Sequence, residues 1–277
     1  MQSKIWQVLN LLGFLVMIAA NYAANAVPLN DMDTGAVSEL YPNLFTPAGF
    51  TFSIWGLIYI LLLAFCIYQA RGLFSSSGQV ADVSQLTQEG QKRQKASHLQ
   101  SIGPLFFISC LLNAGWIFAW HYLQIGLSLL IMVALLLVLI KIYLNLGIGV
   151  KEVSRAESFL VNLPFQVYLG WITIATVANV TALLVHLEWD AFGIADSIWT
   201  VVVIAVAMLI ILGFLQRHRD LPIALVAIWS FVGILVKNLD REPMEMPVVV
   251  AAIAAIVIIG IFAGFRLPKS LEKYTES

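Results

Sequence analysis

Residues 158–185 read SFLVNLPFQVYLGWITIATVANVTALLV and carry no charged side chain. A helix needs about 20 consecutive apolar residues to cross the roughly 30 Å hydrocarbon core of a bilayer, because each backbone amide must find a partner inside the segment. The whole chain is similarly apolar, since 60% of its 277 residues are hydrophobic and only 11% are charged. Too few polar side chains remain to coat a water-soluble domain of this size. The composition excludes soluble enzymes, nucleic-acid-binding proteins and disordered scaffolds, and predicts a multi-pass membrane protein.

Similar apolar runs on both sides of this stretch predict an all-α integral membrane protein with eight transmembrane helices. The predicted spans are residues 5–27, 49–70, 101–120, 124–146, 158–185, 196–215, 221–236 and 247–265. The seventh is the shortest, and we expect Pro222 at its start and Lys237 at its end to extend it, because proline suits a first helical turn and a lysine stem can lie along apolar surface.

The distribution of basic residues predicts how the chain crosses the membrane. With the N-terminus inside, only Lys237 and Arg241 of the 15 lysines and arginines lie on the outer side. Because cytoplasmic loops carry the excess of basic residues, we expect an even number of spans and cytoplasmic termini. An alternative is that Lys4, the apolar run after it and Ala24-Asn25-Ala26 form a cleaved secretory signal, which would leave seven spans.

Ionisable and reactive side chains are nearly absent from the predicted spans. Lys141 lies near a cytoplasmic end, and His121 and His186 lie at outer ends. Cys66 and Cys110 lie in apolar runs, where we expect them to act as small hydrophobic residues. No acid–base pair, catalytic nucleophile, proton relay or metal-ligand spacing is visible. Residues 74–100 form the longest polar stretch, which we interpret as a solvated cytoplasmic linker.

Three spans instead carry aromatic and amide side chains at helical spacing. These groups are Phe52, Trp55 and Tyr59; Asn113, Trp116 and Trp120; and Tyr168, Trp171, Ala175 and Asn179. Steps of three and four residues place each group on one helix face. Converging faces of this kind would form a mostly apolar pocket that suits a flat hydrophobic ligand. The alternative is that the aromatics only pack or anchor the helices, and that each asparagine contributes about 0.6–2 kcal/mol of interhelical hydrogen bonding.

The fifth span resembles the last helix of the translocator protein family, also called tryptophan-rich sensory proteins (TspO/MBR). The family pattern there is Tyr-Leu-Ala-Trp, then three residues, then Ala-Thr, and an Asn three residues after that Thr. Residues 168–179 of this chain read YLGWITIATVAN and follow this pattern except for Gly170. Residues 45–59 are similar to the family's Pro-Pro-x-Trp-Val-Phe and Trp-x-x-x-Tyr motif, although Phe50 replaces its first tryptophan. Residues 113–116 match its Asn-x-x-Trp.

The resemblance covers residues 1–187, which we expect to form a five-helix membrane domain, whereas residues 188–277 form a three-helix extension without a counterpart in five-helix members. It implies an internal pocket that binds tetrapyrroles, sterols or drug-like aromatics. The pocket residues that it implies are Phe52, Trp55, Tyr59, Asn113, Trp116, Tyr168, Trp171, Ala175 and Asn179. Loop 31–46 would act as a lid, with Tyr41, Pro42 and Phe45 over the mouth.

Three functions are compatible with these patterns. The first is a sensor or regulator that binds a flat hydrophobic ligand. The alternative is a secondary transporter or permease for a small amphipathic metabolite, in which the three extra helices complete the translocation unit. A third, by analogy with the family alone, is an enzyme that degrades a bound tetrapyrrole in light with Trp55 and Trp171 as electron donors.

We expect no required cofactor and no metal; a porphyrin or haem would be a ligand. The expected partners are membrane lipid, a hydrophobic small molecule and a second copy in a homodimer, with no nucleic acid. The expected location is a bacterial plasma (inner) membrane. In the extension, Trp199 and Trp229 either pack or extend a binding surface. Gly213, Gly233, Gly260 and Gly264 would allow close helix approach.

Overall fold

The computed structural model describes residues 2–27, 29–71 and 102–266. Eight helices of 17 residues or more lie in these ranges: α1 (Gln2–Ala26), α3 (Ile54–Ala70), α5 (Leu105–His121), α6 (Ile125–Leu146), α8 (Leu163–His186), α9 (Asp196–His218), α10 (Leu221–Leu239) and α11 (Met246–Phe265). Short helices are α2 (Thr34–Glu39) and α7 (Arg155–Glu157), and no described residue is in a strand. The predicted all-α membrane fold is confirmed. The predicted linker 74–100 lies outside the described residues.

Seven of the long helices are both long and apolar enough to span a membrane, if α3, itself 17 residues long, is counted together with the 3-10 turn Gly49–Ser53 that precedes it. The other, α5, is apolar but has 17 residues, because it begins only after Pro104. Helix α10 is longer than its predicted span 221–236, with Pro222 in its first turn and Lys237 in its last. The helix begins at Leu221, as predicted, and continues three residues past the predicted end, so the expected extension is found only at the Lys237 end. The count of eight spans and the cytoplasmic termini stay predictions.

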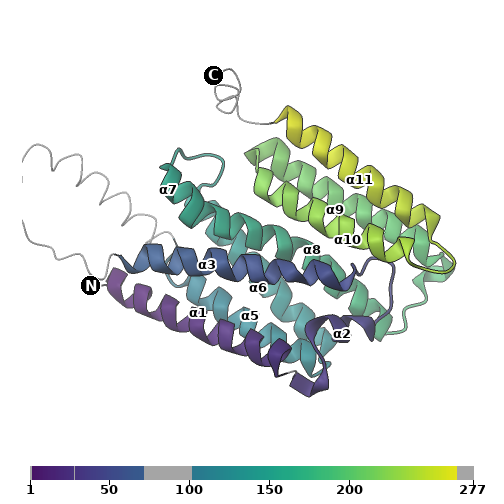
Figure 1. Ribbon diagram of the computed structural model, residues 1–277, viewed down its shortest axis with the longest axis horizontal. Coiled ribbons are helices and arrows are strands. Elements are labelled where there is room, and N and C mark those ends of the chain that lie inside the picture. The colour runs from purple at the N-terminus through teal and green to yellow at the C-terminus, as the bar shows by residue number, and fades with distance from the viewer. Residues whose placement is uncertain (1, 28, 72–101, 267–277) are drawn as a thin grey trace, which may run out of the picture.

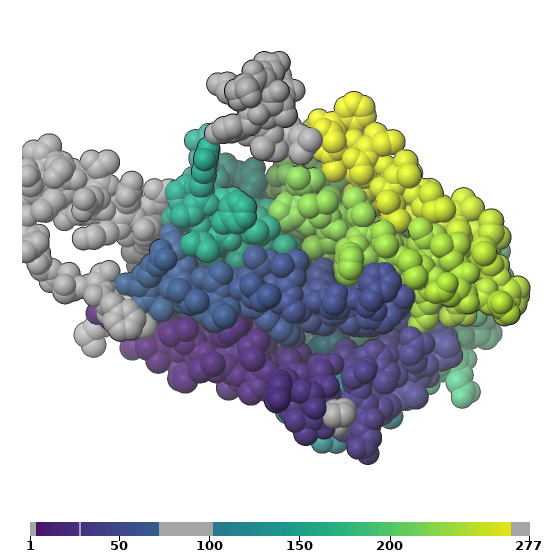
Figure 2. All heavy atoms as spheres, viewed as in Figure 1, coloured from purple at the N-terminus to yellow at the C-terminus, as the bar shows by residue number. Residues whose placement is uncertain are grey.

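The long helices form two groups that share one contact surface (Figure 1). Helices α1, α3, α5, α6 and α8 pack together as a bundle, and α9, α10 and α11 pack against one another. The second group meets the bundle mainly where α10 lies along α8. In the space-filling view the segment that leads into α3 lies directly against the side chains of the second group (Figure 2). The three C-terminal helices are thus packed onto the bundle.

A cluster of phenylalanines fills the half of the bundle away from α2. Phe65, Phe106 and Phe165 meet edge to face, with ring centroids 5.0, 5.1 and 5.8 Å apart. Such tilted contacts are the favoured geometry for aromatic pairs. Cys66 and Cys110 are buried and unbridged, as expected of small core residues.

Helix α10 approaches α8 closely at Gly170. A Cβ atom on Gly170 would lie 3.2 Å from Val226 Cβ and 3.3 Å from Ile223 Cα. The translocator pattern has alanine at this position, and the glycine here removes the atom that would press on α10. Small residues allow this kind of backbone approach between membrane helices. The departure from the pattern therefore coincides with the contact that the extra helices make.

Asp220 joins the start of α10 to the bundle. Its Oδ1 accepts a hydrogen bond from the Ile223 amide at 3.1 Å, and its Oδ2 accepts one from the Tyr143 hydroxyl of α6 at 2.6 Å. The side chain is 1% exposed. Burial raises the pKa of Asp220, and the hydrogen bond from Tyr143 opposes part of that rise. Sequence reasoning did not single out this residue, which is an acid in a short loop between two apolar runs.

The raised pKa of Asp220 predicts a pH dependence of stability. Because folded Asp220 keeps a proton that the unfolded chain has already lost, stability should fall as the pH rises from about 4 through the raised folded pKa. Asp220→Asn is neutral at all pH values and should not show this fall, as measured by thermal unfolding in detergent. Asp220→Ala should unfold more easily than Asp220→Asn by about 1–2 kcal/mol, because it loses the helix cap. Identical pH profiles for the wild type and Asp220→Asn would contradict this account.

Candidate functional site: a tryptophan cavity

A small cavity lies in the half of the bundle nearest α2. Its volume is about 40 Å³. The lining residues are Thr34, Ser38, Pro47, Phe52, Trp55, Trp116, Trp120, Trp171, Ile174, Ala175, Ala178 and Asn179. No charged side chain lines it within the described part of the chain, and four of its twelve lining residues are tryptophans. The walls therefore offer large aromatic faces and a few neutral polar groups.

The tryptophans come from three helices and touch one another. The Trp55 ring of α3 lies 5.9 Å from Trp116 of α5 and 6.1 Å from Trp171 of α8, centroid to centroid. Trp116 stacks on Trp120, one turn further along α5, at 5.9 Å. The three helix faces that the spacing predicts thus meet at one place. The faces were visible in the sequence because they recur every three or four residues.

The cavity-lining members of the predicted pocket set are Phe52, Trp55, Trp116, Trp171, Ala175 and Asn179. The other three members do not line it and lie one layer behind. Tyr59 stacks on Trp55 at 5.7 Å, and the edge of Tyr168 meets the same tryptophan at 6.1 Å. Asn113 is fully buried beside Tyr168. These three residues support the cavity wall and are not part of its surface.

Asn113 links three helices through both ends of its amide. Its Oδ1 accepts a hydrogen bond from Asn21 Nδ2 of α1 at 2.7 Å, and its Nδ2 donates to the Tyr168 hydroxyl of α8 at 3.0 Å. Both ends of the amide are thus occupied by protein. This geometry matches the interhelical alternative weighed for asparagines in spans. Asn21 was missed in the sequence, although a lone asparagine in an apolar run is the signal for such a partner.

Asn179 lies in the cavity wall with its amide already engaged. Its Oδ1 accepts a hydrogen bond from Trp116 Nε1 at 3.2 Å, and its Nδ2 donates to Ser128 Oγ of α6 at 3.1 Å. Trp120 Nε1 donates to the backbone oxygen of Thr34 at 3.2 Å. Two of the four indole N–H groups are therefore satisfied inside the protein.

The indole N–H of Trp171 differs from these two. It is buried, and no acceptor lies within hydrogen-bonding distance among the described residues. The Tyr59 hydroxyl in the layer behind is in the same position. Leaving a buried donor unpaired costs about 1–3 kcal/mol, so each such group in a native structure needs a reason. A ligand with an acceptor atom would supply the partner that Trp171 lacks.

The loop before α3 covers the cavity with residues other than the predicted ones. Thr34, Ser38 and Pro47 line the cavity, whereas Tyr41, Pro42 and Phe45 do not. Asp33 caps α2 by accepting a hydrogen bond from the Ala36 amide at 2.8 Å. Positions 34 and 38 then share the helix face that is turned to the tryptophans. The prediction treated residues 31–46 as a lid loop and did not include this helix.

The three predicted lid residues have other contacts. The Tyr41 ring packs against Trp120 at 6.2 Å and against His186 at 5.7 Å. Pro42 and Phe45 line a separate cavity of about 220 Å³ between the loop, α8 and α9. The loop therefore separates two spaces.

Periodicity alone could have found some of the missed lining residues. Trp120 continues the spacing of Trp116, and Ile174 and Ala178 continue the face of Trp171. Thr34 and Ser38 lie on the short helix α2, which the sequence analysis did not predict, and Pro47 lies in the irregular segment after it, where no period indicates which side chains point inward. The sequence therefore predicts the helical walls of the cavity better than its cover.

A model of the TSPO-like protein family matches residues 7–265. The chain belongs to this family. The match confirms the resemblance drawn from the sequence, and it extends through all eight long helices of this TSPO-like protein. A search of curated proteins and a search of solved structures each found no match.

The Asn113 network predicts a stability effect that is separate from ligand binding. Asn113→Ala breaks hydrogen bonds between α1, α5 and α8, and should destabilise the TSPO-like protein by about 1–2 kcal/mol. Ser109→Ala is the matched control, because the Ser109 hydroxyl is equally buried on α5 but bonds only to the Phe106 carbonyl of its own helix. Thermal unfolding in detergent measures both. Equal unfolding temperatures for the two variants would show that the network does not hold the helices together.

Proposed function

We propose that this TSPO-like membrane protein binds a flat hydrophobic ligand, namely a tetrapyrrole, sterol-like or aromatic molecule, in the tryptophan cavity and acts as a sensor or regulator. One observation carries the proposal. Within the described part of the chain, Trp171 presents a buried N–H without an acceptor, in the wall of an uncharged cavity that tryptophans from three helices surround. The aromatic faces would stack on a planar ligand, and the N–H would donate to a carbonyl or carboxylate at its edge.

The volume of the cavity adds a condition to this proposal. About 40 Å³ holds roughly one water molecule, whereas pockets for drug-sized ligands measure about 300–1,000 Å³. The described conformation is thus a closed one, in which the tryptophans fill their own pocket. A ligand enters only when side chains or the covering loop move. Binding is then coupled to a change of conformation, which is what a sensor requires.

The chemistry of the lining supports binding over the alternatives. Transporters that couple to ions use ionisable groups at mid-membrane depth, and the described lining has none. A photochemical enzyme would likewise need an acid or base near the pigment. Asn179 and Trp171 are the polar groups on α8 that line the cavity, and both are neutral. These features favour recognition without turnover.

Other parts of the proposal depend on the family resemblance. We place the protein in the plasma (inner) membrane of a bacterium, with lipid around it and a homodimer as its assembly. A porphyrin or haem would be an exchangeable ligand in this scheme. Chemical crosslinking in intact membranes tests the dimer.

Titration with protoporphyrin IX, followed by quenching of tryptophan fluorescence, tests the site. The wild type should quench saturably. Trp171→Phe keeps an aromatic ring but removes the N–H, and should weaken binding about 2- to 12-fold, the equivalent of one neutral hydrogen bond. Ala175→Phe fills the space beside Trp171 and should weaken binding more than about tenfold. Trp6→Phe is the matched control, because Trp6 lies near the start of α1 and lines neither this cavity nor the 220 Å³ cavity.

Two outcomes would contradict the proposal. The first is quenching that does not saturate in the wild type, and the second is an unchanged Kd in both cavity variants. In proteoliposomes, retention of porphyrin at the binding stoichiometry supports a binding protein. Accumulation above that level, driven by an ion gradient, would instead support the permease alternative. Loss of the pigment's absorption bands under illumination would support the enzyme.

A further inference from the structure

One face of α10 follows the segment that covers the cavity. Residues 39–52, here called the cover segment, connect α2 to the start of α3. Positions four residues apart on α10 share a helix face, and those that meet the cover segment are Trp229, Gly233, Lys237 and, just past the helix end, Arg241. Lys237 Nζ pairs with Glu39 Oε1 at 2.7 Å, although this pair is exposed and contributes little by itself.

Two backbone hydrogen-bonding groups of the cover segment are bonded directly to α10. The Ala48 amide donates to the Gly233 carbonyl at 3.0 Å, and the Thr51 carbonyl accepts a hydrogen bond from Trp229 Nε1 at 3.0 Å. Neither bond depends on a flexible, charged side chain. These bonds fix the path of the backbone itself.

The bonded groups lie next to the residues that line the cavity. Pro47 immediately precedes the first and Phe52 immediately follows the second, and both line the cavity. The Phe52 ring also meets Trp171 edge to face at 6.0 Å. Displacing the cover segment from α10 would therefore move two wall residues, and one of them, Phe52, is in contact with Trp171.

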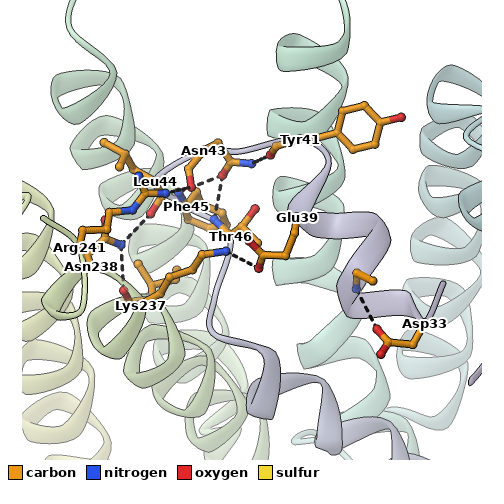
Figure 3. Close-up of polar contacts among 12 residues, drawn as sticks. Asp33, Glu39, Tyr41, Asn43, Leu44, Phe45, Thr46, Lys237, Asn238 and Arg241 are labelled. Atoms are coloured by element: carbon orange, nitrogen blue, oxygen red, sulfur yellow. Dashed lines mark hydrogen bonds and ion pairs between the residues drawn. The ribbon is translucent and has the colours of Figure 1, made fainter.

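Two further side chains hold the middle of the cover segment. The fully buried Asn238 donates from Nδ2 to the Leu44 carbonyl at 2.9 Å. Arg241 Nη2 donates to the Asn43 carbonyl at 3.1 Å. Figure 3 shows both side chains reaching from the end of α10 to the backbone of the cover segment. On its other side the segment borders the 220 Å³ cavity, which gives it space to move.

Helix α10 approaches the cover segment closely at Gly233. A Cβ atom there would overlap Thr51 Oγ1 and would lie 3.0 Å from Pro47 Cβ. A larger residue would therefore push α10 and the cover segment apart. The other end of α10 is held by Asp220 and by the contact at Gly170, so the cover segment is the part free to give way.

We propose that α10 is the positioning element of the tryptophan cavity: it holds the cover segment closed, and the cavity opens when that segment leaves α10. Gly233, Trp229 and Asn238 are the positioning residues. The C-terminal helices, which the five-helix pattern lacks, would thus control access to the site. The consequence for ligand entry rests on the proposed function, whereas the positioning claim can be tested without a ligand.

Maleimide labelling of a cysteine in the cavity wall tests the claim directly. Ser38→Cys places the probe at a buried lining position. Combined with Gly233→Leu, the Ser38→Cys probe should label at least about tenfold faster than in Ser38→Cys alone. The reason is that the equilibrium shifts toward the state in which the cover segment has left α10. Combined with the milder Asn238→Ala, which removes one hydrogen bond to the segment, it should label about 2- to 12-fold faster.

The controls separate opening of the cavity from general loosening. Gly213→Leu on α9 makes the same substitution where a Cβ atom meets no neighbour within 4 Å, and should leave labelling unchanged. The buried Cys66 and Cys110 report on the rest of the bundle and should stay unlabelled in every variant. Labelling of Cys66 or Cys110 in Gly233→Leu would indicate partial unfolding. In that case the labelling rate of Ser38→Cys in Asn238→Ala decides whether release of the cover segment opens the cavity.

The outcomes are distinct for the two proposals. Faster labelling in Gly233→Leu and Asn238→Ala, with the rate in Gly213→Leu unchanged from that of the Ser38→Cys parent, supports the role of α10. Labelling rates equal to that of the Ser38→Cys parent in both variants would overturn it. Protoporphyrin association should speed up in parallel. If neither the wild type nor any of these variants binds the porphyrin, the proposed function is overturned, and the labelling result still decides the role of α10.

Discussion

The close packing of α8 against α10 at Gly170 is the constraint on which the arrangement depends. Gly170 faces α10, and the next residue, Trp171, faces the cavity. One helix therefore serves both the C-terminal group and the pocket. Because α10 lies this close to α8, it can also reach the segment that covers the tryptophans. Without α10 that segment would lack its hydrogen bonds to Trp229, Gly233 and Asn238.

Hydrogen bonding in an apolar interior separates structural from functional polar groups. Asn113, Asn179 and Trp120 have partners within the protein, so their polar atoms stabilise helix contacts. Trp171 Nε1 has none among the described residues. Leaving such a donor unpaired costs about 1–3 kcal/mol, and an acceptor atom placed in the cavity, from a ligand or from a single water molecule, removes that cost. Sequence pattern treats all of these residues alike, and only geometry distinguishes them.

The sequence predicted the helices and the helical walls of the site because both are periodic. Trp55, Trp116 and Trp171 lie on faces that repeat every three or four residues, and they converge as predicted. Sequence did not predict the cover of the site, where Thr34 points inward because a short capped helix turns it. It also missed Asp220, because nothing local shows that a loop acid is buried by a tyrosine from another helix.

The central claim is that a planar ligand replaces the packing of the tryptophans around Trp171. An experimental structure of the protein with protoporphyrin IX tests it most directly. The account predicts the pigment between Trp55, Trp116 and Trp171, with an acceptor atom within hydrogen-bonding distance of Trp171 Nε1 and the cover segment moved from α10. A pigment bound only on the lipid-facing surface, with the tryptophans still in mutual contact, would contradict it.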